Sequence, residues 1–418
     1  MKPVEIPLRY GHRQLAIRVP EANLVGVVRP HPAETPGDEE AILAEALAHP
    51  LGTPPLRDLV SRGGRVAIVT SDLTRPCPSA RMLPPLLAEL EGAGVRDTEI
   101  TIILALGLHR PMTEKERAVA LGREVAERYR VIHHDPEDTL HLGVTQRGTT
   151  VELFRPLVEA DVRIALGNVE FHYFAGYSGG AKAVFPGCAS AKAVTANHAM
   201  MVLSEACAGR LEGNPLREDL EEAADLLGVD FILNVVVDAG HRITAATAGD
   251  VTLAHRVLCE RVAARGKIPV DAPADIVLAS AGGYPQDVNV YQAHKALENA
   301  SLFIRDGGVL ILAAECVEGF GHDVFETWMT DGSSPDELIA RIQREFVLGG
   351  HKAAAVAKIL QRGKVLLVSE LPDEQVRKMH MHPFPGMEGA LAAAMEEAGR
   401  DAHVLVLPEA NSVLPSFR

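Results

Sequence analysis

The sequence predicts an α/β fold of two domains, each with a mainly parallel sheet flanked by helices and with the active site in the interdomain cleft. Apolar runs of strand length recur along the chain, and alanine-rich stretches with helical periodicity separate them. The apolar runs are continuous rather than alternating, which is typical of strands covered on both faces. With 418 residues and a hydrophobic fraction of 47%, the chain is long and apolar enough for two or three domains.

The expected strands fall into two series. The first series comprises 65–70, 100–106, 131–133, 162–167 and 231–237, and the second comprises 276–280, 309–313, 365–369 and 403–406. Residues 1–20 alternate like a pair of strands, and segments such as 79–94 and 294–304 have helical periodicity. Aromatic residues make up only 4% of the chain, so aliphatic residues and alanine must fill the interior.

A proline-containing segment, RGKIPVDAPAD at 265–275, separates the two series and predicts a domain boundary. We therefore expect an N-terminal domain of residues 1–265 and a C-terminal domain of residues 275–400. The tail, residues 401–418, is expected to pack back on the N-terminal domain.

The overall charge argues against some classes of partner. The formal net charge is -15 and no long basic run occurs, which disfavours nucleic acid and anionic membranes. The start lacks the apolar core of a signal peptide, and no uncharged apolar window reaches the length of a spanning helix. The 5 cysteines are scattered without a CxxC pair, so we expect a reduced, cytoplasmic protein without a thiolate zinc site.

Polar residues gather directly after the expected strands. SDLTRPCPS follows the first strand, GLHRPMT the second and NVEFHYFAGYSGGAK the fourth, while AGGYPQDVNVYQAHK opens the second series. Ligands bind outside the carboxyl ends of the strands in open parallel sheets. We therefore expect these loops to converge on one cleft.

The first two loops offer a cation and a proton-transfer group. Arg75 is shaped to bind a carboxylate with two parallel hydrogen bonds, unless it only forms an ion pair with Asp72. Asp72 and Thr74 have a structural alternative as caps of the next helix. His109, after a glycine, suits proton transfer near neutral pH, although a histidine bonded to the backbone is the simpler interpretation. Thr113 and Glu116, in the same loop, fit a helix capping box.

The segment HYFAGYSGGAK is the richest in chemical groups. Gly176, Gly179 and Gly180 allow the backbone to approach a ligand closely and predict an anion-binding nest of N–H groups. Lys182 suits a phosphate counterion or a nucleophilic amine. His198, expected on a helix, suits metal ligation through a neutral imidazole, with a satisfied core histidine as the alternative.

In the second series, Gln292 and Lys295 are three residues apart and share a face if their segment is helical. Such a pair is usually a solvated face, but its place after a glycine-rich strand end favours the interdomain cleft. HExxH is absent and the histidines are dispersed. A metal held by one histidine together with an organic cofactor therefore fits better than a metal held by protein ligands alone.

Jointly, these motifs make the chain resemble the nickel-dependent lactate racemase family, whose members racemise or epimerise 2-hydroxy acids. The resemblance rests on SDLTRP, GLHRPMT, HYFAGYSGGAK with a histidine 16 residues beyond the lysine, and YQAHK, and it covers essentially the whole chain. It implies a nickel-pincer nucleotide (pyridinium-3,5-bisthiocarboxylic acid mononucleotide nickel) attached covalently to Lys182. Separate biosynthetic proteins make this cofactor, so without them the protein is expected to lack it.

The resemblance also implies a role for each matched residue. His198 would ligate nickel, and Gly179 and Gly180 would lie against the cofactor. His109 and His172 would be the catalytic acid and base on opposite faces of a substrate that gives up and regains hydride. The remaining matched residues would bind the substrate, with Arg75 on its carboxylate and Lys295 beside the reacting oxygen: Asp72, Arg75, Tyr291, Gln292 and Lys295.

The substrate within this class stays open between lactate, malate, aromatic lactates and sugar acids. Tyr173, Phe174 and Tyr177 could shape the pocket for the substrate side chain. Two other functions remain open as well. One is a Schiff-base aldolase or decarboxylase that uses Lys182 without nickel, and the other is a non-catalytic binding protein on the same scaffold.

Overall fold

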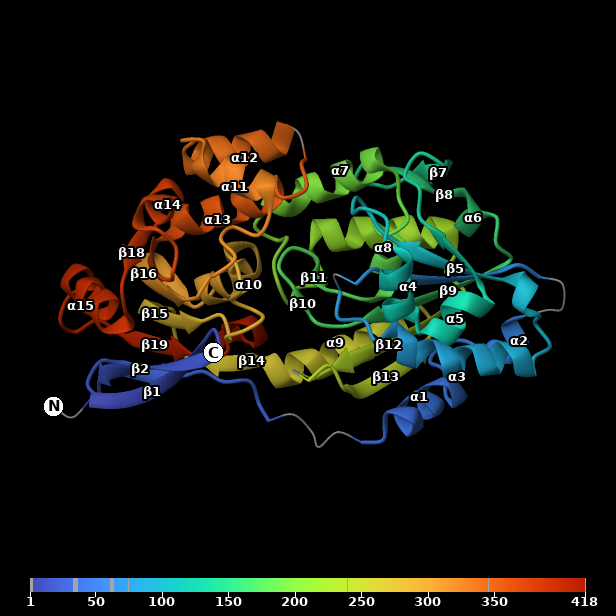
Figure 1. Cartoon of the computed structure of the whole chain (residues 1–418), viewed down its shortest axis with the longest axis horizontal. Helices are drawn as coiled ribbons and strands as arrows, with labels where there is room; N and C mark the ends of the chain where they lie inside the picture. The colour runs from blue at the N-terminus through green and yellow to red at the C-terminus, as the bar shows by residue number, and fades with distance from the viewer. Residues whose placement is uncertain are drawn as a thin grey trace. The chain divides into compact units, whose positions relative to one another are not determined.

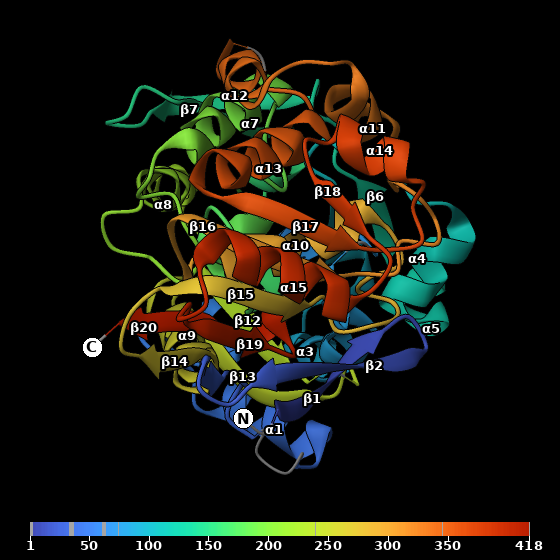
Figure 2. The ribbon, with the colours of Figure 1, turned by 90° about the vertical axis from the view of Figure 1, so that its left-hand side faces the viewer.

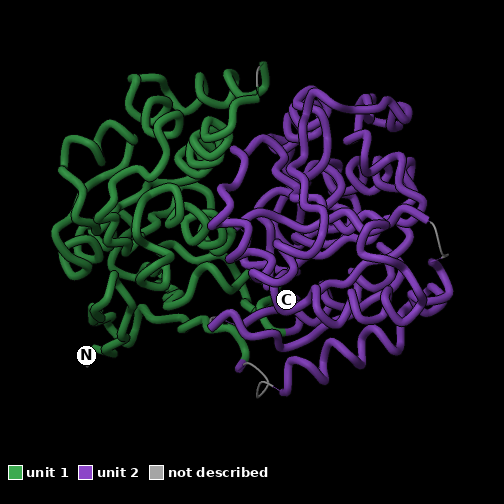
Figure 3. The backbone as a smooth tube through the Cα atoms, turned by 45° about the vertical axis from the view of Figure 1, so that its right-hand side comes forward, with its two compact units in different colours: residues 1–31, 265–418 green, residues 32–264 purple. Residues whose placement is uncertain are grey.

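A computed structural model describes residues 3–32, 37–60, 64–73, 75–238, 240–344 and 346–417. The chain forms two compact units, which Figure 3 colours separately: unit 1 combines residues 1–31 with 265–418, and unit 2 comprises residues 32–264. In the described part of the chain each unit contains a six-stranded sheet with flanking helices (Figure 1). The predicted α/β class with mainly parallel sheets is confirmed.

The sheet of unit 2 has the strand order β13-β12-β9-β4-β5-β6. Its strands are β4 (Val66–Ser71), β5 (Ile100–Ala105), β6 (Arg130–His133), β9 (Val162–Asn168), β12 (Phe231–Val237) and β13 (Ile243–Gly249). All neighbours run parallel except the antiparallel pair of β12 and β13. The carboxyl ends of β4, β5 and β9 therefore lie at the same edge, as the sequence predicts.

Helices and short hairpins surround this sheet. They are α1 (Glu39–Ala48), α2 (Leu56–Leu59), α3 (Ser79–Gly92), α4 (Glu114–Leu121), α5 (Arg123–Arg128), α6 (Arg155–Val158), α7 (Ala191–Ala199), α8 (Pro215–Leu227), α9 (Leu253–Gly266), β7 (Thr139–Val144) with β8 (Thr150–Phe154), β10 (Phe171–His172) with β11 (Gly176–Tyr177), and the 3-10 turns η1 (Asp97–Glu99), η2 (Gly180–Ala183) and η3 (Met200–Val202).

The two faces of this sheet have different roles. Ile164, Leu166 and Leu233 point to the face where the leucines of α3 form the main core. Because successive strand residues point to opposite faces, Gly167 and Asn234 point to the other one, where the turn at Gly179 packs. One face therefore stabilises the unit, and the other supports the glycine-rich segment.

The sheet of unit 1 is parallel throughout, in the order β18-β17-β16-β15-β19-β3. Its strands are β3 (Leu24–Val27), β15 (Ala274–Ser280), β16 (Ile304–Ala313), β17 (Lys364–Val368), β18 (His382–Phe384) and β19 (Val404–Leu407). Its other elements are the hairpin β1 (Pro3–Tyr10) and β2 (Arg13–Pro20), the pair β14 (Lys267–Val270) and β20 (Leu414–Phe417), η4 (Ala410–Ser412), α10 (Val290–Ser301), α11 (Asp323–Thr330), α12 (Pro335–Arg344), α13 (Gly350–Arg362), α14 (Asp373–Lys378) and α15 (Met387–Ala398). Helix α15 lies across one face of this sheet, beside the hairpin (Figure 2).

The division of the chain differs from the expected one at both termini. Residues 1–31 belong to unit 1, because the hairpin buries Leu8 and Ile17 against Leu278 of β15 and β3 pairs with β19. The tail, residues 401–418, supplies β19, which lies between β15 and β3, and β20, which pairs with β14. The alternation of the first strands is clear in the sequence, but it does not indicate which sheet they cover.

Candidate functional site

The ring of Phe174 lies among three of the predicted site residues. Its centroid is 4.5 Å from that of His172, 5.0 Å from that of His198 and 5.5 Å from the Lys182 Nζ. His172 is the last residue of β10 and Phe174 lies in the loop between β10 and β11, while Lys182 comes from η2 and His198 from α7. Residues from three separate segments are thus brought together in unit 2.

His172 has a defined ring orientation. Its Nδ1 accepts a hydrogen bond from the backbone N–H of Ala175 at 3.3 Å, and its ring stacks on Tyr173 with centroids 5.2 Å apart. In the neutral ring, an accepting Nδ1 places the proton on Nε2. In this tautomer the exchangeable proton of the ring is therefore on Nε2.

His109 is paired with Asp72. The His109 Nδ1 lies 2.6 Å from the Asp72 Oδ2, and the carboxylate is only 6% exposed. The two loops meet because β4 and β5 are neighbours with Ser71 opposite Ala105. A buried carboxylate on one imidazole nitrogen orients the ring, which suits proton transfer at the other nitrogen.

This pairing bears on the alternatives for Asp72 and His109, while an ion pair between Arg75 and Asp72 stays a prediction. Helix α3 begins after Pro78 without a side-chain cap, so Asp72 does not cap it and instead holds His109. Thr74 lies outside the described residues. The capping box of Thr113 and Glu116 at the start of α4 is confirmed.

Lys182 has an unusual electrostatic environment. Burial lowers the pKa of its amine well below the usual value, and the positive charges of Arg75 and Arg217 lower it further. A lowered pKa increases the fraction of neutral amine at neutral pH, and the neutral amine is the nucleophilic form. The lowered pKa suits the nucleophilic amine, and this role of Lys182 stays a prediction.

His198 lies on α7, as predicted, and is 9% exposed. Burial lowers its pKa to about 3, with the charges of Lys182 and Arg75 contributing in the same direction. The imidazole is thus neutral at neutral pH, which is the form that binds metals. Arg75 is close enough to affect both Lys182 and His198, so it belongs to the same cluster of charges.

The glycines of the segment are required by close packing. Gly180 has a φ of 57°, and a Cβ at this position would lie 2.8 Å from the His255 Cγ. A Cβ on Gly179, with a φ of 74°, would lie 2.7 Å from the Asn234 Oδ1. The backbone N–H of Gly180 donates to this Asn234 oxygen at 2.7 Å. The predicted anion nest is therefore wrong for Gly180, because its N–H already has an acceptor within the protein.

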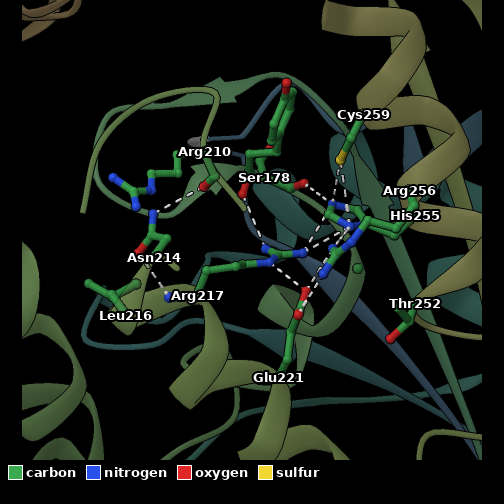
Figure 4. Close-up of polar contacts among 12 residues, drawn as sticks. Ser178, Arg210, Asn214, Leu216, Arg217, Glu221, Thr252, His255, Arg256 and Cys259 are labelled. Atoms are coloured by element: carbon green, nitrogen blue, oxygen red, sulfur yellow. Dashed lines mark hydrogen bonds and ion pairs between the residues drawn. The ribbon is translucent and has the colours of Figure 1, made fainter. Parts of the chain in front are cut away.

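A polar cluster that the sequence did not predict lies beneath this turn (Figure 4). Arg217 is completely buried, and its guanidinium donates to the Glu221 Oε1 at 2.6 Å and to the Tyr177 carbonyl at 3.3 Å. His255 donates from Nε2 to the Ser178 carbonyl at 2.8 Å, and its Nδ1 lies 2.9 Å from the Arg217 Nη2. Arg217 falls on a helix that looks amphipathic, so no local signal in the sequence distinguishes it from an exposed arginine.

The predicted substrate-binding residues of the second series all lie in unit 1. Tyr291, Gln292 and Lys295 are on α10, and the last two are exposed on a common face. The Lys352 Nζ, which the sequence analysis did not single out, donates to the Tyr291 carbonyl at 2.6 Å and lies 3.5 Å from the centroid of its ring. Whether Gln292 and Lys295 face a cleft between the units stays a prediction.

Two features are absent from the residues that the structure describes: a cluster of metal-binding side chains and a membrane-spanning helix. No group of three or more His, Cys, Asp or Glu side chains among them could hold a metal ion. No helix in the described ranges is long and apolar enough to cross a membrane.

Comparison with known proteins gives a consistent result. Residues 10–209 match the model of the lactate racemase N-terminal domain, and residues 270–414 match that of the lactate racemase C-terminal domain. The chain is 35% identical to a lactate racemase of Thermoanaerobacterium thermosaccharolyticum, covering 99% of both chains. It is 31% identical to a lactate racemase of Lactiplantibacillus plantarum, covering 98% of this chain and 99% of the relative.

Solved structures agree with these matches. The lactate racemase apoprotein of T. thermosaccharolyticum superposes with a TM-score of 0.91 at 35% identity, covering 99% of this chain and 100% of the other. A protein from Thermotoga maritima shares the fold, with a TM-score of 0.67 at 19% identity, covering 93% of this chain and 100% of the other. The chain therefore belongs to the lactate racemase family and is an isomerase of the racemase class.

Proposed function

We propose that this protein racemises lactate or a close 2-hydroxy acid, with a nickel-pincer nucleotide bound to Lys182 and His198. The observation that carries the proposal is the grouping of His172, Lys182 and His198 around Phe174 in unit 2. The two relatives at 35% and 31% identity are both lactate racemases, which supports lactate as the first substrate to test.

The side chains present fit such a cofactor. A neutral amine is needed for covalent attachment, and burial together with Arg75 and Arg217 favours that form of Lys182. A neutral imidazole is needed for nickel ligation, and the pKa of His198 at about 3 provides it. When bound, the cofactor supplies reversible hydride acceptance, a chemistry that amino-acid side chains lack.

The residues of the chain supply binding and proton transfer. In our proposal, Arg75 binds the substrate carboxylate through two parallel hydrogen bonds. His109, oriented by Asp72, takes the hydroxyl proton of one enantiomer, and His172 takes that of the other through Nε2. Lys295 of unit 1 stabilises negative charge on the reacting oxygen.

The alternatives are less well supported. A lysine with a lowered pKa also suits a Schiff-base enzyme, but membership of a racemase family favours the racemase. A protein that only binds its ligand does not need an imidazole held by a buried carboxylate, so the pair of His109 and Asp72 favours catalysis.

The test uses protein produced together with the cofactor-making proteins. We expect one nickel per chain, a mass adduct on the peptide that contains Lys182, and loss of optical purity with enantiopure lactate. Other enantiopure 2-hydroxy acids then define the substrate range. A Lys182 peptide that borohydride traps with a keto acid, in protein without nickel, would favour the Schiff-base enzyme instead.

Two histidine variants separate catalysis from binding. His109→Ala should retain nickel and the adduct but lose racemisation by more than about 100-fold, the usual scale for a general acid–base group. His49→Ala is the matched control, because its side chain is 74% exposed at the end of α1. Equal turnover of both variants would rule out His109 as a catalytic residue.

A further inference from the structure

Helix α8 contacts both segments that carry a residue proposed to hold the cofactor. One segment leads to Lys182, and the other carries His198. The Asn214 Nδ2, at its N-cap, donates to the Phe174 carbonyl at 2.8 Å. Arg217 donates to the Tyr177 carbonyl at 3.3 Å. Asp219 accepts a hydrogen bond from the Asn197 Nδ2 at 2.8 Å, and Asn197 directly precedes His198.

The carboxylate of Asp219 is completely buried and is the centre of a local network. It accepts from the hydroxyls of Thr145 and Thr149, which lie on either side of the turn between β7 and β8, as well as from Asn197. The same Asn197 amide also donates to the Leu216 carbonyl at 3.1 Å. Burying a carboxylate is unfavourable unless several donors satisfy it, so these donors hold the last turn of α7 in one position.

Arg217 holds the other segment, the turn that leads to Lys182, in a similar way. Its buried guanidinium is balanced by Glu221, which also binds Arg256 with oxygens 2.8 and 2.7 Å from its nitrogens. Together with His255, it fixes two consecutive carbonyls of the turn that leads to Lys182 (Figure 4). Since the N–H of Gly180 is held by Asn234, this turn has little freedom to move.

Residues 217 and 219 project in nearly opposite directions, because two residues of an α-helix correspond to a rotation of about 200°. One side of α8 therefore holds the turn before Lys182, and the other holds the end of α7 beside His198. The helix therefore connects the turn before Lys182 with the end of α7, and its side chains set the distance between Lys182 and His198.

We propose that Arg217 and Asp219 are positioning residues which, through α8, fix Lys182 and His198 at the separation that the cofactor requires. This inference rests on the proposed function, in which these two groups hold the cofactor. Asp219 acts through Asn197 on the metal ligand, and Arg217 acts through the turn on the attachment site. Neither residue is itself a ligand.

The experiment compares wild type, Asp219→Asn and Arg217→Lys, each produced with the cofactor-making proteins. Asp225→Asn is the matched control, since it makes the same change on an exposed position of the same helix. The measurements are the mass adduct on the Lys182 peptide, nickel retention against a competing chelator and the electronic absorption spectrum of the nickel centre.

Asp219→Asn should keep the adduct, lose nickel at about 10- to 100-fold lower chelator concentration and show a shifted absorption spectrum. Arg217→Lys should lower the fraction of chains with the adduct, because a single ammonium does not replace the fork of a guanidinium. Asp225→Asn should match wild type in all three measurements. A role confined to overall stability would change the amount of folded protein but not the spectrum of the loaded fraction.

A second pair of variants keeps the inference testable if Asp219→Asn does not fold. Thr149→Val removes one donor to Asp219 at nearly constant volume, and Thr149→Ser restores it. We expect Thr149→Val to release nickel more easily and Thr149→Ser to behave like wild type. If wild type carries nickel and the adduct, and the variants retain nickel as well as wild type with the same absorption spectrum, this inference is wrong and the proposed function is unaffected. Wild type without nickel or adduct would overturn the proposed function and this inference with it.

Discussion

Replacing Gly180 with alanine should destabilise unit 2 far more than an ordinary glycine substitution. The backbone at Gly180 has a φ of 57°, so an alanine is strained by roughly 1–2 kcal/mol from its conformation alone. The added Cβ would also lie 2.8 Å from the His255 Cγ and 3.2 Å from the Arg217 Nη2. Both residues are completely buried, so neither side chain can turn outward into solvent without breaking its contacts.

The expected loss of unfolding free energy depends on which contact the added Cβ disrupts. If the His255 ring shifts, its hydrogen bond to the Ser178 carbonyl is lost, which costs about 1–3 kcal/mol for a buried pair. Added to the backbone strain, the total loss of unfolding free energy is about 2–5 kcal/mol. A domain of this size changes its Tm by roughly 2–4 °C per kcal/mol, so a decrease of about 4–20 °C is expected.

Calorimetry of the protein without cofactor measures this effect directly. The single tryptophan, Trp328, lies in unit 1, so its fluorescence does not report on unit 2. Gly148→Ala is the matched control: it is also in unit 2 with a φ of 86°, and no described atom beyond its neighbours lies within 4 Å of the added Cβ. Peptide-resolved hydrogen exchange should show faster exchange at residues 174–184 only in Gly180→Ala.

The comparison of the two alanine variants decides the outcome. Gly180→Ala should unfold at least about 2 °C below Gly148→Ala, since only the first carries the additional loss of a buried contact. Equal decreases in Tm would show that His255 and Arg217 do not restrict the turn, and the packing argument for Gly180 would be wrong.

Two further predictions concern Asp72 and His134. Asp72→Asn in the loaded enzyme should lower kcat/KM about 10- to 100-fold, because a hydrogen bond to a charged group contributes about 1.5–3 kcal/mol. Unchanged racemisation in a chiral assay would contradict the role of the pair formed by Asp72 and His109. His134 is buried, and burial lowers its pKa from 6.5 to about 4, so the folded state binds fewer protons than the unfolded state. The contribution of neutral His134 to the free energy of unfolding is therefore fully present above about pH 6.5. It decreases by about 3 kcal/mol in all as the pH falls towards 4. His134→Phe should remove this part of the pH dependence of urea unfolding. An identical pH dependence in wild type and variant would contradict this assignment.

Several features of the site required the tertiary structure. Asp72 and His109 are 37 residues apart, so the sequence alone could not distinguish a helix cap from a partner of the histidine. Arg217 and Asp219 look like exposed residues of an amphipathic helix, but the packing of α8 against α7, η2, α9 and the β7–β8 hairpin buries them. The hairpin at residues 3–20 could cover either sheet, and its burial against β15 decided which one.

The sequence by itself determined the α/β class, the loops that carry the candidate site residues and most strands of the two six-stranded sheets, although it did not predict β3, β13 and β18. Continuous apolar runs such as 162–167 and 231–237 are local signals, since burial of both faces requires apolar residues at every position. The positions of His109, Lys182 and His198 after strands or on a helix follow from the same local pattern. The tertiary structure decided which of these groups meet and which buried residues hold them, because those contacts join residues far apart in the chain. Ion pairing, burial and pKa depend on such distant neighbours, and no local pattern of residues contains that information.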